Sequence, residues 1–243
     1  MSEETKRVLV WSGWLRLSHA LIALSTLLLL ATGELISQSP MLASNAADIH
    51  NYVAGFLAIG LLIRIVLMFI GQPNERIGNL IPKAIELPPI VEMLRFYALL
   101  GKAPLPRWYA QNPLWKPIYL AFYLVLMMQV ITGLFIQEGG LLLGFYPPSL
   151  HIFWAMALLI FTLFHLFCVI WHDYKGGGSD VSAMINGLRS FTIDQPAPLE
   201  KGEQPITFKP LKSPYSKKYA GLKIPLNPPF SKGETAASLP RVT

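Results

Sequence analysis

The sequence predicts an all-helical membrane protein built as a bundle of four transmembrane helices. Of its 243 residues, 53% are hydrophobic and only 14% are charged, whereas soluble domains carry about 25% charged residues. At four places an apolar run reaches the roughly 20 residues that a helix needs to cross a bilayer. These runs cover residues 14–36, 50–70, 117–137 and 150–172.

The basic residues are distributed so that they encode the topology of the chain. They precede the first run, occupy the segment between the second and third runs, and follow the fourth run, whereas segments 37–49 and 138–149 contain none. Because Lys and Arg concentrate on the cytoplasmic side of membrane proteins, both termini are expected in the cytoplasm. The net charge of +6 therefore reflects membrane orientation and does not indicate a nucleic-acid partner.

The remaining segments divide the chain into a membrane domain, residues 1–192, and a tail, residues 193–243. In the long loop, "LPPIVEMLRFYALLG" predicts an amphipathic helix on the inner leaflet, begun by its prolines. After the fourth run, "VSAMINGLRSF" predicts a short helix with Ser179 or Asp180 as its N-cap. The Pro- and Lys-rich tail is typical of a disordered cytoplasmic segment, either dispensable or partner-binding.

Four histidines fall at two depths in the predicted bundle. His151 and His165 are 14 residues apart on the fourth span, which corresponds to about 21 Å of helical rise on nearly the same face. His19, near the inner end of the first span, has a depth comparable to that of His165. His50, at the outer start of the second span, has a depth comparable to that of His151. The histidines thus form an inner pair and an outer pair.

This pattern indicates two haems stacked along the membrane normal. Haem iron takes axial ligands on both sides of a flat ring, and ligation by two imidazoles suits electron transfer. Helical bundles build such sites from side chains on facing helices. A single intramembrane histidine is equally explained by hydrogen bonding between helices, but four at paired depths are not. A metal cluster fits less well, because the pairs are too far apart to converge.

Two further residues leave alternatives open. His172, seven positions after His165, is an alternative inner ligand, although it lies nearer the polar interface. Arg64 has the depth of the inner pair and is expected either to bind a haem propionate or to extend to the cytoplasmic surface.

Several stretches resemble the b-type cytochrome membrane subunit of respiratory nickel–iron hydrogenases. "RLSHALIALSTLLLLATG" is similar to its first span, "HNYVAGFLAIGLLIRIVLMFIG" to its second and "NPLWKPIYLAFYLVLMMQVITG" to its third, and "AMINGLRSF" is similar to the segment after its fourth. The match covers about residues 7–192. The related di-haem subunits of formate dehydrogenases and the bacterial cytochromes b561 share this plan.

The resemblance implies that two haems b are bound through iron by His19, His50, His151 and His165. It also implies a bacterial inner-membrane location and a hydrogenase partner with a periplasmic iron–sulfur small subunit and a catalytic large subunit. Electrons would pass from that enzyme to quinone, for which Asn112 in the matched "NPL" lies in the relevant region. Other candidate quinone or proton contacts are His172, Asp173 and Tyr174.

Some positions depart from the family pattern, and other functions stay open. Ala20 and Gln111 replace an aromatic residue and a histidine, and "WHDY" replaces an acidic–basic cluster at the end of the fourth span. The partner could therefore be a formate dehydrogenase or a thiosulfate-type reductase. A stand-alone quinone oxidoreductase and an ion carrier with relaying histidines are further alternatives. The chain itself is expected to be an electron-transfer subunit without a catalytic substrate site.

Overall fold

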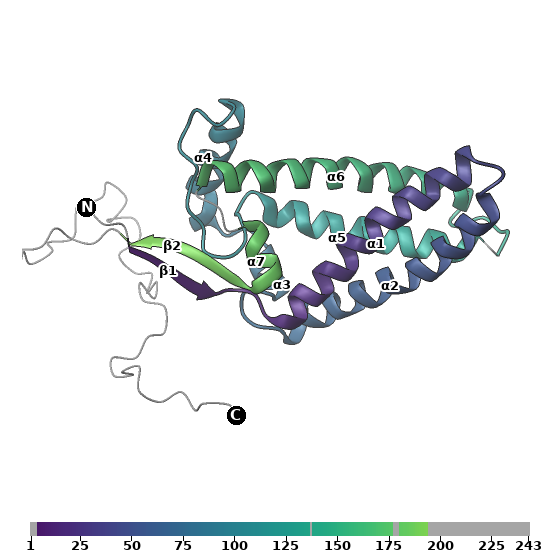
Figure 1. Ribbon diagram of the computed structural model, residues 1–243, viewed down its shortest axis with the longest axis horizontal. Coiled ribbons are helices and arrows are strands. Elements are labelled where there is room, and N and C mark those ends of the chain that lie inside the picture. The colour runs from purple at the N-terminus through teal and green to yellow at the C-terminus, as the bar shows by residue number, and fades with distance from the viewer. Residues whose placement is uncertain (1–3, 137, 177–179, 194–243) are drawn as a thin grey trace, which may run out of the picture. The chain divides into compact units, whose positions relative to one another are not determined.

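The computed structural model describes residues 4–136, 138–176 and 180–193, and it contains four helices long and apolar enough to cross a membrane. They are α1 (Gly13–Gln38), α2 (Ala43–Ile70), α5 (Trp115–Ile136) and α6 (Pro147–Gly176) (Figure 1). These helices confirm the four predicted spans. The predicted tail, beyond Ile193, lies outside the described residues.

The four long helices form two hairpins, in which α1 packs along α2 and α5 packs along α6. The first hairpin closes tightly at Gly60, whose carbonyl oxygen accepts a hydrogen bond from Ser18 Oγ at 2.9 Å. A Cβ atom at Gly60 would lie only 2.8 Å from Leu21 Cβ. The hairpins meet at mid-bundle in one buried apolar cluster, formed by Ile22, Leu57, Leu61, Leu126 and Leu158.

A buried carboxylate joins the start of α1 to the end of α2. Ser12 caps α1 by accepting the Leu15 N–H at 3.1 Å. The Glu75 carboxylate accepts the Ser12 N–H at 3.2 Å and the Gln72 N–H at 2.9 Å. This negative charge therefore lies at the positive end of the α1 dipole, where it is stabilising. Arg64 of α2 donates to the Glu75 carbonyl at 2.7 Å and ties the same turn to the bundle.

The connection between the hairpins contains α3 (Ile77–Leu80), the 3₁₀ turn η1 (Ala84–Glu86) and α4 (Leu87–Ala98). Helix α4 confirms the helix predicted within "LPPIVEMLRFYALLG", with proline in its first turn. It buries Met93 and Phe96, and the Phe96 ring lies 5.0 Å from that of Trp171 on α6. Leu100 and Gly101 then reverse the chain with positive φ angles of 50° and 73°.

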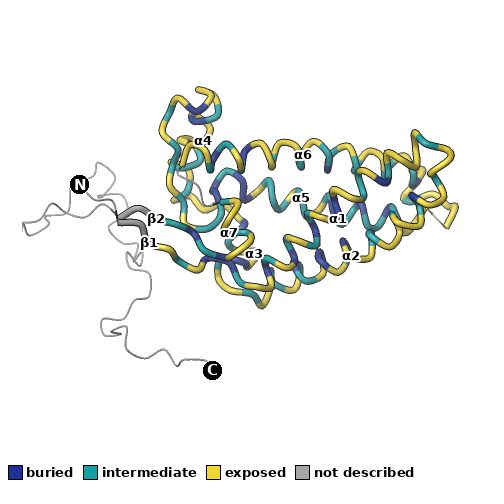
Figure 2. The backbone as a smooth tube through the Cα atoms, in the orientation of Figure 1, coloured by how far each residue is buried: buried dark blue, intermediate teal, exposed yellow. Residues whose placement is uncertain are grey.

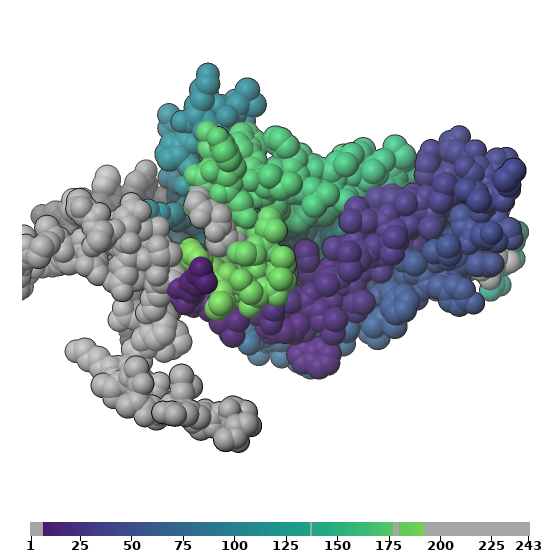
Figure 3. Space-filling model, viewed as in Figure 1, coloured from purple at the N-terminus to yellow at the C-terminus, as the bar shows by residue number. Residues whose placement is uncertain are grey.

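Two strands that the sequence analysis did not predict flank the helices, one before α1 and one after the last described helix. β1 (Glu4–Leu9) pairs antiparallel with β2 (Leu188–Ile193), so that Leu9 lies opposite Leu188. The helix predicted through residue 191 is α7 (Asp180–Asn186), which ends earlier because Gly187 has a φ of +85°. Local periodicity cannot reveal this pairing, since the partner strand lies at the other end of the domain. In the space-filling view, α7 lies against both α1 and α6 (Figure 3).

The outward faces of the long helices are largely apolar and exposed (Figure 2). On α6 the exposed side chains include Ile152, Phe153, Met156, Ile160, Leu163 and Phe167. In a bilayer such a surface contacts lipid tails, so its exposure carries no free-energy penalty. The buried positions are therefore few, and the polar ones among them identify the regions where chemistry is concentrated.

The contact at Gly60 yields the first prediction. Gly60→Ala forces α1 and α2 apart, and we expect it to destabilise the protein by about 1–3 kcal/mol, as overpacking does. The measurement is the thermal unfolding midpoint of the purified protein in detergent. Gly55→Ala is the matched control on the same helix, because a Cβ there meets nothing within 4 Å. Equal midpoints for the two variants would contradict the close approach of α1 and α2.

Candidate functional site

The structure brings the outer pair of histidines together from different hairpins. His50 lies in the second turn of α2 and His151 near the start of α6. Their ring centroids are 6.2 Å apart, and the ring planes are inclined by 64°. If each imidazole nitrogen lies about 2.0 Å from a shared metal, as in other metal sites, the two ring centroids are roughly 6.4 Å apart. The spacing of His50 and His151 thus fits two axial ligands of one iron.

Polar side chains of α1 and α5 hold these two rings. Thr32 Oγ1 lies 2.8 Å from His50 Nδ1, and Thr132 Oγ1 lies 3.1 Å from His151 Nδ1. On the other side of the second ring, Gln129 Nε2 lies 3.0 Å from His151 Nε2. Sequence analysis identified neither threonine as a site residue.

The inner pair of histidines lines a cavity of about 490 Å³, a volume in the range of small-molecule and cofactor sites. The polar and aromatic side chains in its wall include His19, Arg64, Asn112, Tyr119, His165 and His172. The His165 ring stacks on Phe161 at 5.5 Å with an angle of 8° between planes. His165 Nδ1 is buried and has no hydrogen-bond partner among the described residues. A cavity wall with such an atom fits a bound prosthetic group, because buried polar atoms are rarely left unpaired.

Arg64 and Asn112 lie in the wall of the same cavity. Arg64 is only 2% exposed, so it does not extend to the surface as one interpretation of the sequence expected. Its Nε donates to the Tyr123 hydroxyl at 3.0 Å, and its charge lies 5.2 Å from the Tyr123 ring centroid. Asn112 Oδ1 accepts the Leu114 N–H at 3.0 Å, while its buried Nδ2 has no partner among the described residues.

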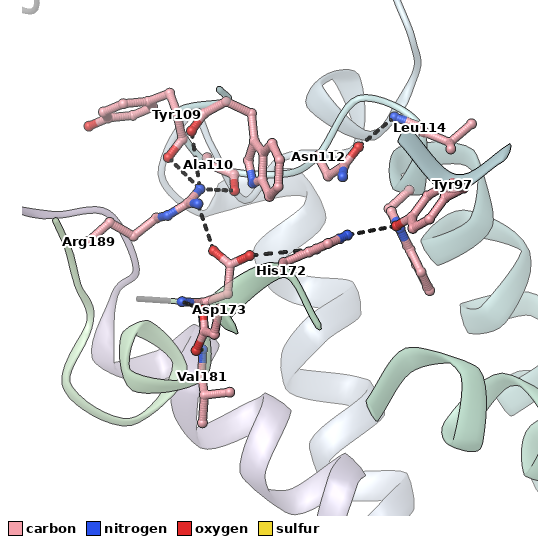
Figure 4. A network of polar contacts seen from close by, with 12 residues as sticks. Tyr97, Tyr109, Ala110, Asn112, Leu114, His172, Asp173, Val181 and Arg189 are labelled. Carbon is pink, nitrogen blue, oxygen red and sulfur yellow. Dashed lines mark hydrogen bonds and ion pairs between the residues drawn. The ribbon is translucent and has the colours of Figure 1, made fainter. Parts of the chain in front are cut away.

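His172 belongs to a polar network with Tyr97, Asp180 and Arg189 (Figure 4). Its Nε2 is hydrogen-bonded to the Tyr97 hydroxyl at 2.8 Å, and that hydroxyl also accepts the Trp115 indole N–H at 2.8 Å. Its Nδ1 lies 3.8 Å from the Asp180 carboxylate, which pairs with Arg189 at 2.6 Å. Both nitrogens of His172 therefore face protein partners, in contrast to His165 Nδ1.

The Arg189 guanidinium organises the loop above the cavity. It donates to the backbone carbonyls of Trp108, Tyr109 and Ala110 at 3.0–3.3 Å. Burial raises the pKa of the Asp180 carboxyl, and the nearby Arg189 charge opposes that rise. Burial also raises the pKa of Tyr97. These groups connect β2, α7, α6 and α4 around the entrance to one cavity.

Two other predicted contacts lie elsewhere. The Asp173 carboxylate accepts the N–H groups of Asp180 and Val181 at 2.6 and 3.0 Å, so it caps the start of α7. Tyr174 is 83% exposed and does not line the cavity. Among the residues that the structure describes, no three His, Cys, Asp or Glu side chains are grouped to hold a metal ion.

Comparisons with known proteins find one matching family model and several similar proteins. A family model described as prokaryotic cytochrome b561 matches residues 10–187. Three relatives carry the name probable Ni/Fe-hydrogenase B-type cytochrome subunit. The one from Bradyrhizobium diazoefficiens is 27% identical over 76% of this chain and 86% of the relative. Those from Cupriavidus necator and Azotobacter vinelandii are 26% and 27% identical, over 76% and 78% of this chain and 88% and 91% of the relatives. No solved structure matches the chain.

The Tyr97 hydroxyl gives a prediction for this network. Tyr97→Phe leaves Trp115 Nε1 and His172 Nε2 buried without their shared partner, and each loss is expected to cost about 1–3 kcal/mol of unfolding free energy. Thermal unfolding in detergent measures the effect. Tyr52→Phe, at a side chain that is 76% exposed, is the control and is expected to unfold like the wild type. An unchanged midpoint for Tyr97→Phe would show that the network does not support the fold.

Proposed function

Because the chain belongs to the family of prokaryotic cytochromes b561, we propose that it is the membrane-anchoring cytochrome b subunit of a nickel–iron hydrogenase. It passes electrons from a periplasmic catalytic large subunit and iron–sulfur small subunit to quinone in the bacterial inner membrane. The observation that carries this proposal is that the rings of His50 and His151, from opposite hairpins, have centroids 6.2 Å apart. The names of the relatives support the hydrogenase partner.

In the proposed arrangement, both termini lie in the cytoplasm and the outer histidines lie near the periplasm. When bound, two b-type haems supply one-electron transfer between the two faces of the membrane. His50 and His151 would hold the haem at the outer site, and His19 and His165 would hold the haem at the inner site. Aromatic rings surround the His165 imidazole, with centroids 5.5–6.0 Å away on Trp115, Tyr119 and Phe161.

The hydrogen bonds of the inner region favour His165 over His172 as the ligand. His172 Nε2 is hydrogen-bonded to the Tyr97 hydroxyl, and its Nδ1 lies 3.8 Å from the Asp180 carboxylate. His165 has a nitrogen without a partner among the described residues and faces the same cavity as His19. Ligation by His172 would require the loss of contacts that hold α4, α6 and α7 together.

The charge of Arg64 supports a binding site for an anionic group. Arg64 is buried and forms no ion pair with the residues that the structure describes. A buried charge without a counter-charge is costly, so a haem propionate at this wall of the cavity would neutralise it. Its hydrogen bonds to Tyr123 and to the Glu75 carbonyl fix the guanidinium in place for that contact.

Quinone reduction is proposed at the cytoplasmic end of the cavity. Asn112 Nδ2 is a buried donor suited to a quinone carbonyl oxygen. His172 lines the same cavity and is connected to Asp180, so it is positioned to hold a proton close to the reduced quinone. Proton uptake from the cytoplasmic side would make the electron transfer charge-separating.

Histidine substitutions test the ligand assignment. His151→Ala is expected to lose the outer haem while the inner haem stays bound, because His19 and His165 are untouched. His172→Ala is the matched control on the same helix and is expected to keep both haems. The measurements are haem content per chain and reduced-minus-oxidised absorption spectra of the purified proteins. Retention of both haems by His151→Ala would refute the assignment.

The same variant tests the partner and the acceptor. In membranes that contain the hydrogenase subunits, His151→Ala is expected to abolish hydrogen-dependent quinone reduction but to leave hydrogen oxidation with a soluble dye intact. Quinone reduction by the wild-type chain from a reductant without any hydrogenase subunit would favour a stand-alone oxidoreductase. A purified wild-type chain without a b-type haem signal would leave only the ion-carrier interpretation.

A further inference from the structure

The outer histidines lie against two matching Thr-Gly pairs. Thr32 and Gly33 on α1 are beside His50, and Thr132 and Gly133 on α5 are beside His151. The second set follows the first along the chain by 100 positions for the Thr-Gly pairs and by 101 for the histidines. Each hairpin therefore presents one imidazole through the same local arrangement.

The threonine hydroxyls define where the imidazole protons lie. Thr32 Oγ1 is 2.8 Å from the Leu28 carbonyl oxygen, and Thr132 Oγ1 is 2.8 Å from the Met128 carbonyl oxygen. Two oxygen atoms at this distance require a proton between them, and a hydroxyl has only one. Each threonine must therefore accept, not donate, in its contact with the histidine. His50 and His151 both carry their proton on Nδ1 and donate it to a threonine.

A second contact independently gives the same assignment for His151. The Gln129 amide nitrogen is a donor and lies 3.0 Å from His151 Nε2. His151 Nε2 is consequently the acceptor nitrogen, with its lone pair available, and Nδ1 carries the proton. His151 would hold a haem through this nitrogen, in place of the Gln129 contact.

The two glycines provide room for the rings. A Cβ atom at Gly133 would lie 3.2 Å from His151 Cε1 and 3.6 Å from its Nδ1. A Cβ atom at Gly33 would lie 3.7 Å from His50 Cε1, which is an ordinary contact. Any side chain at Gly133 therefore presses on the imidazole, whereas Gly33 tolerates a methyl group.

We propose that Thr32, Thr132 and Gly133 are positioning residues for the outer haem, a role that rests on the proposed ligation by His50 and His151. The threonines hold each ring as the Nδ1–H tautomer and leave Nε2 as the nitrogen that would hold the haem, and Gly133 leaves room for the second ring beside α5. Hydrogen bonds of this kind fix the orientation of a ligating histidine and raise its basicity. The threonines thus also lower the reduction potential of the outer haem, since a more basic ligand favours ferric iron.

The test uses Thr32→Val and Thr132→Val, which keep the side-chain shape but remove the acceptor oxygen. We expect each variant to retain the outer haem about 10- to 100-fold less tightly, which is the usual cost of losing such a partner. The outer haem that remains is expected to titrate at a higher potential, and the inner haem at its wild-type potential. Haem content per chain and a redox titration of the purified proteins in detergent measure both effects. Thr32→Ser and Thr132→Ser keep the oxygen and are expected to behave like the wild type.

The outcomes separate this proposal from the ligand assignment. If both valine variants retain the outer haem as tightly as the wild type and at the same reduction potential, the positioning role is overturned. If His50→Ala also keeps both haems, the ligand assignment has failed instead. The inner haem signal reports whether a variant has folded. If a valine variant loses both haems, it has not folded, and the outer-haem retention of Gly133→Ala is compared with that of Gly33→Ala instead. Weaker outer-haem retention in Gly133→Ala alone supports the proposal, and equal retention overturns it.

Discussion

An imidazole inside an apolar bundle needs a donor partner for one nitrogen and an acceptor partner for the other, and this bundle contains four half-buried rings with that requirement. The hairpins α1–α2 and α5–α6 are each closed by their own contacts, such as Ser18 with Gly60. They meet through a small apolar cluster at mid-bundle. Outside that cluster, histidines from opposite hairpins face one another at one end and line a shared cavity at the other. The four rings therefore lie where the two hairpins come together.

The two hairpins correspond position by position at the outer pair of histidines but not at the inner pair. At the outer level the repeat is preserved, because Thr32, Gly33 and His50 recur as Thr132, Gly133 and His151. At the inner level the same offsets match His19 with Tyr119 and Arg64 with His165, and all four line the cavity. One hairpin thus contributes a histidine where the other contributes a tyrosine or an arginine. The broken repeat leaves the buried Arg64 charge beside the inner pair, which suits the quinone and proton contacts that we propose there.

The sequence could predict the features that follow from length, period and depth. Apolar runs of about 20 residues defined the four spans, and the 3.6-residue period placed His151 and His165 on one face. Gln129 is a polar residue in an apolar span, and such residues bond between helices; it indeed contacts His151. The β1–β2 pairing and the Asp180–Arg189 ion pair could not be predicted, since each depends on tertiary contacts. Thr32 and Thr132 resemble ordinary small residues in apolar helices, and the recurrence of "ATG" as "ITG" is the one sequence signal that could have linked them.

The central claim is that the two hairpins hold two irons, each between two imidazoles. The most direct measurement is the haem iron content per polypeptide of the wild-type chain purified from its native membrane, combined with the electron paramagnetic resonance spectrum of the oxidised protein. The arrangement of His19, His50, His151 and His165 predicts two haems b per chain and two low-spin ferric signals, because both axial positions of each iron are filled. One haem or none per chain, or a high-spin signal from an iron with an open position, would contradict it.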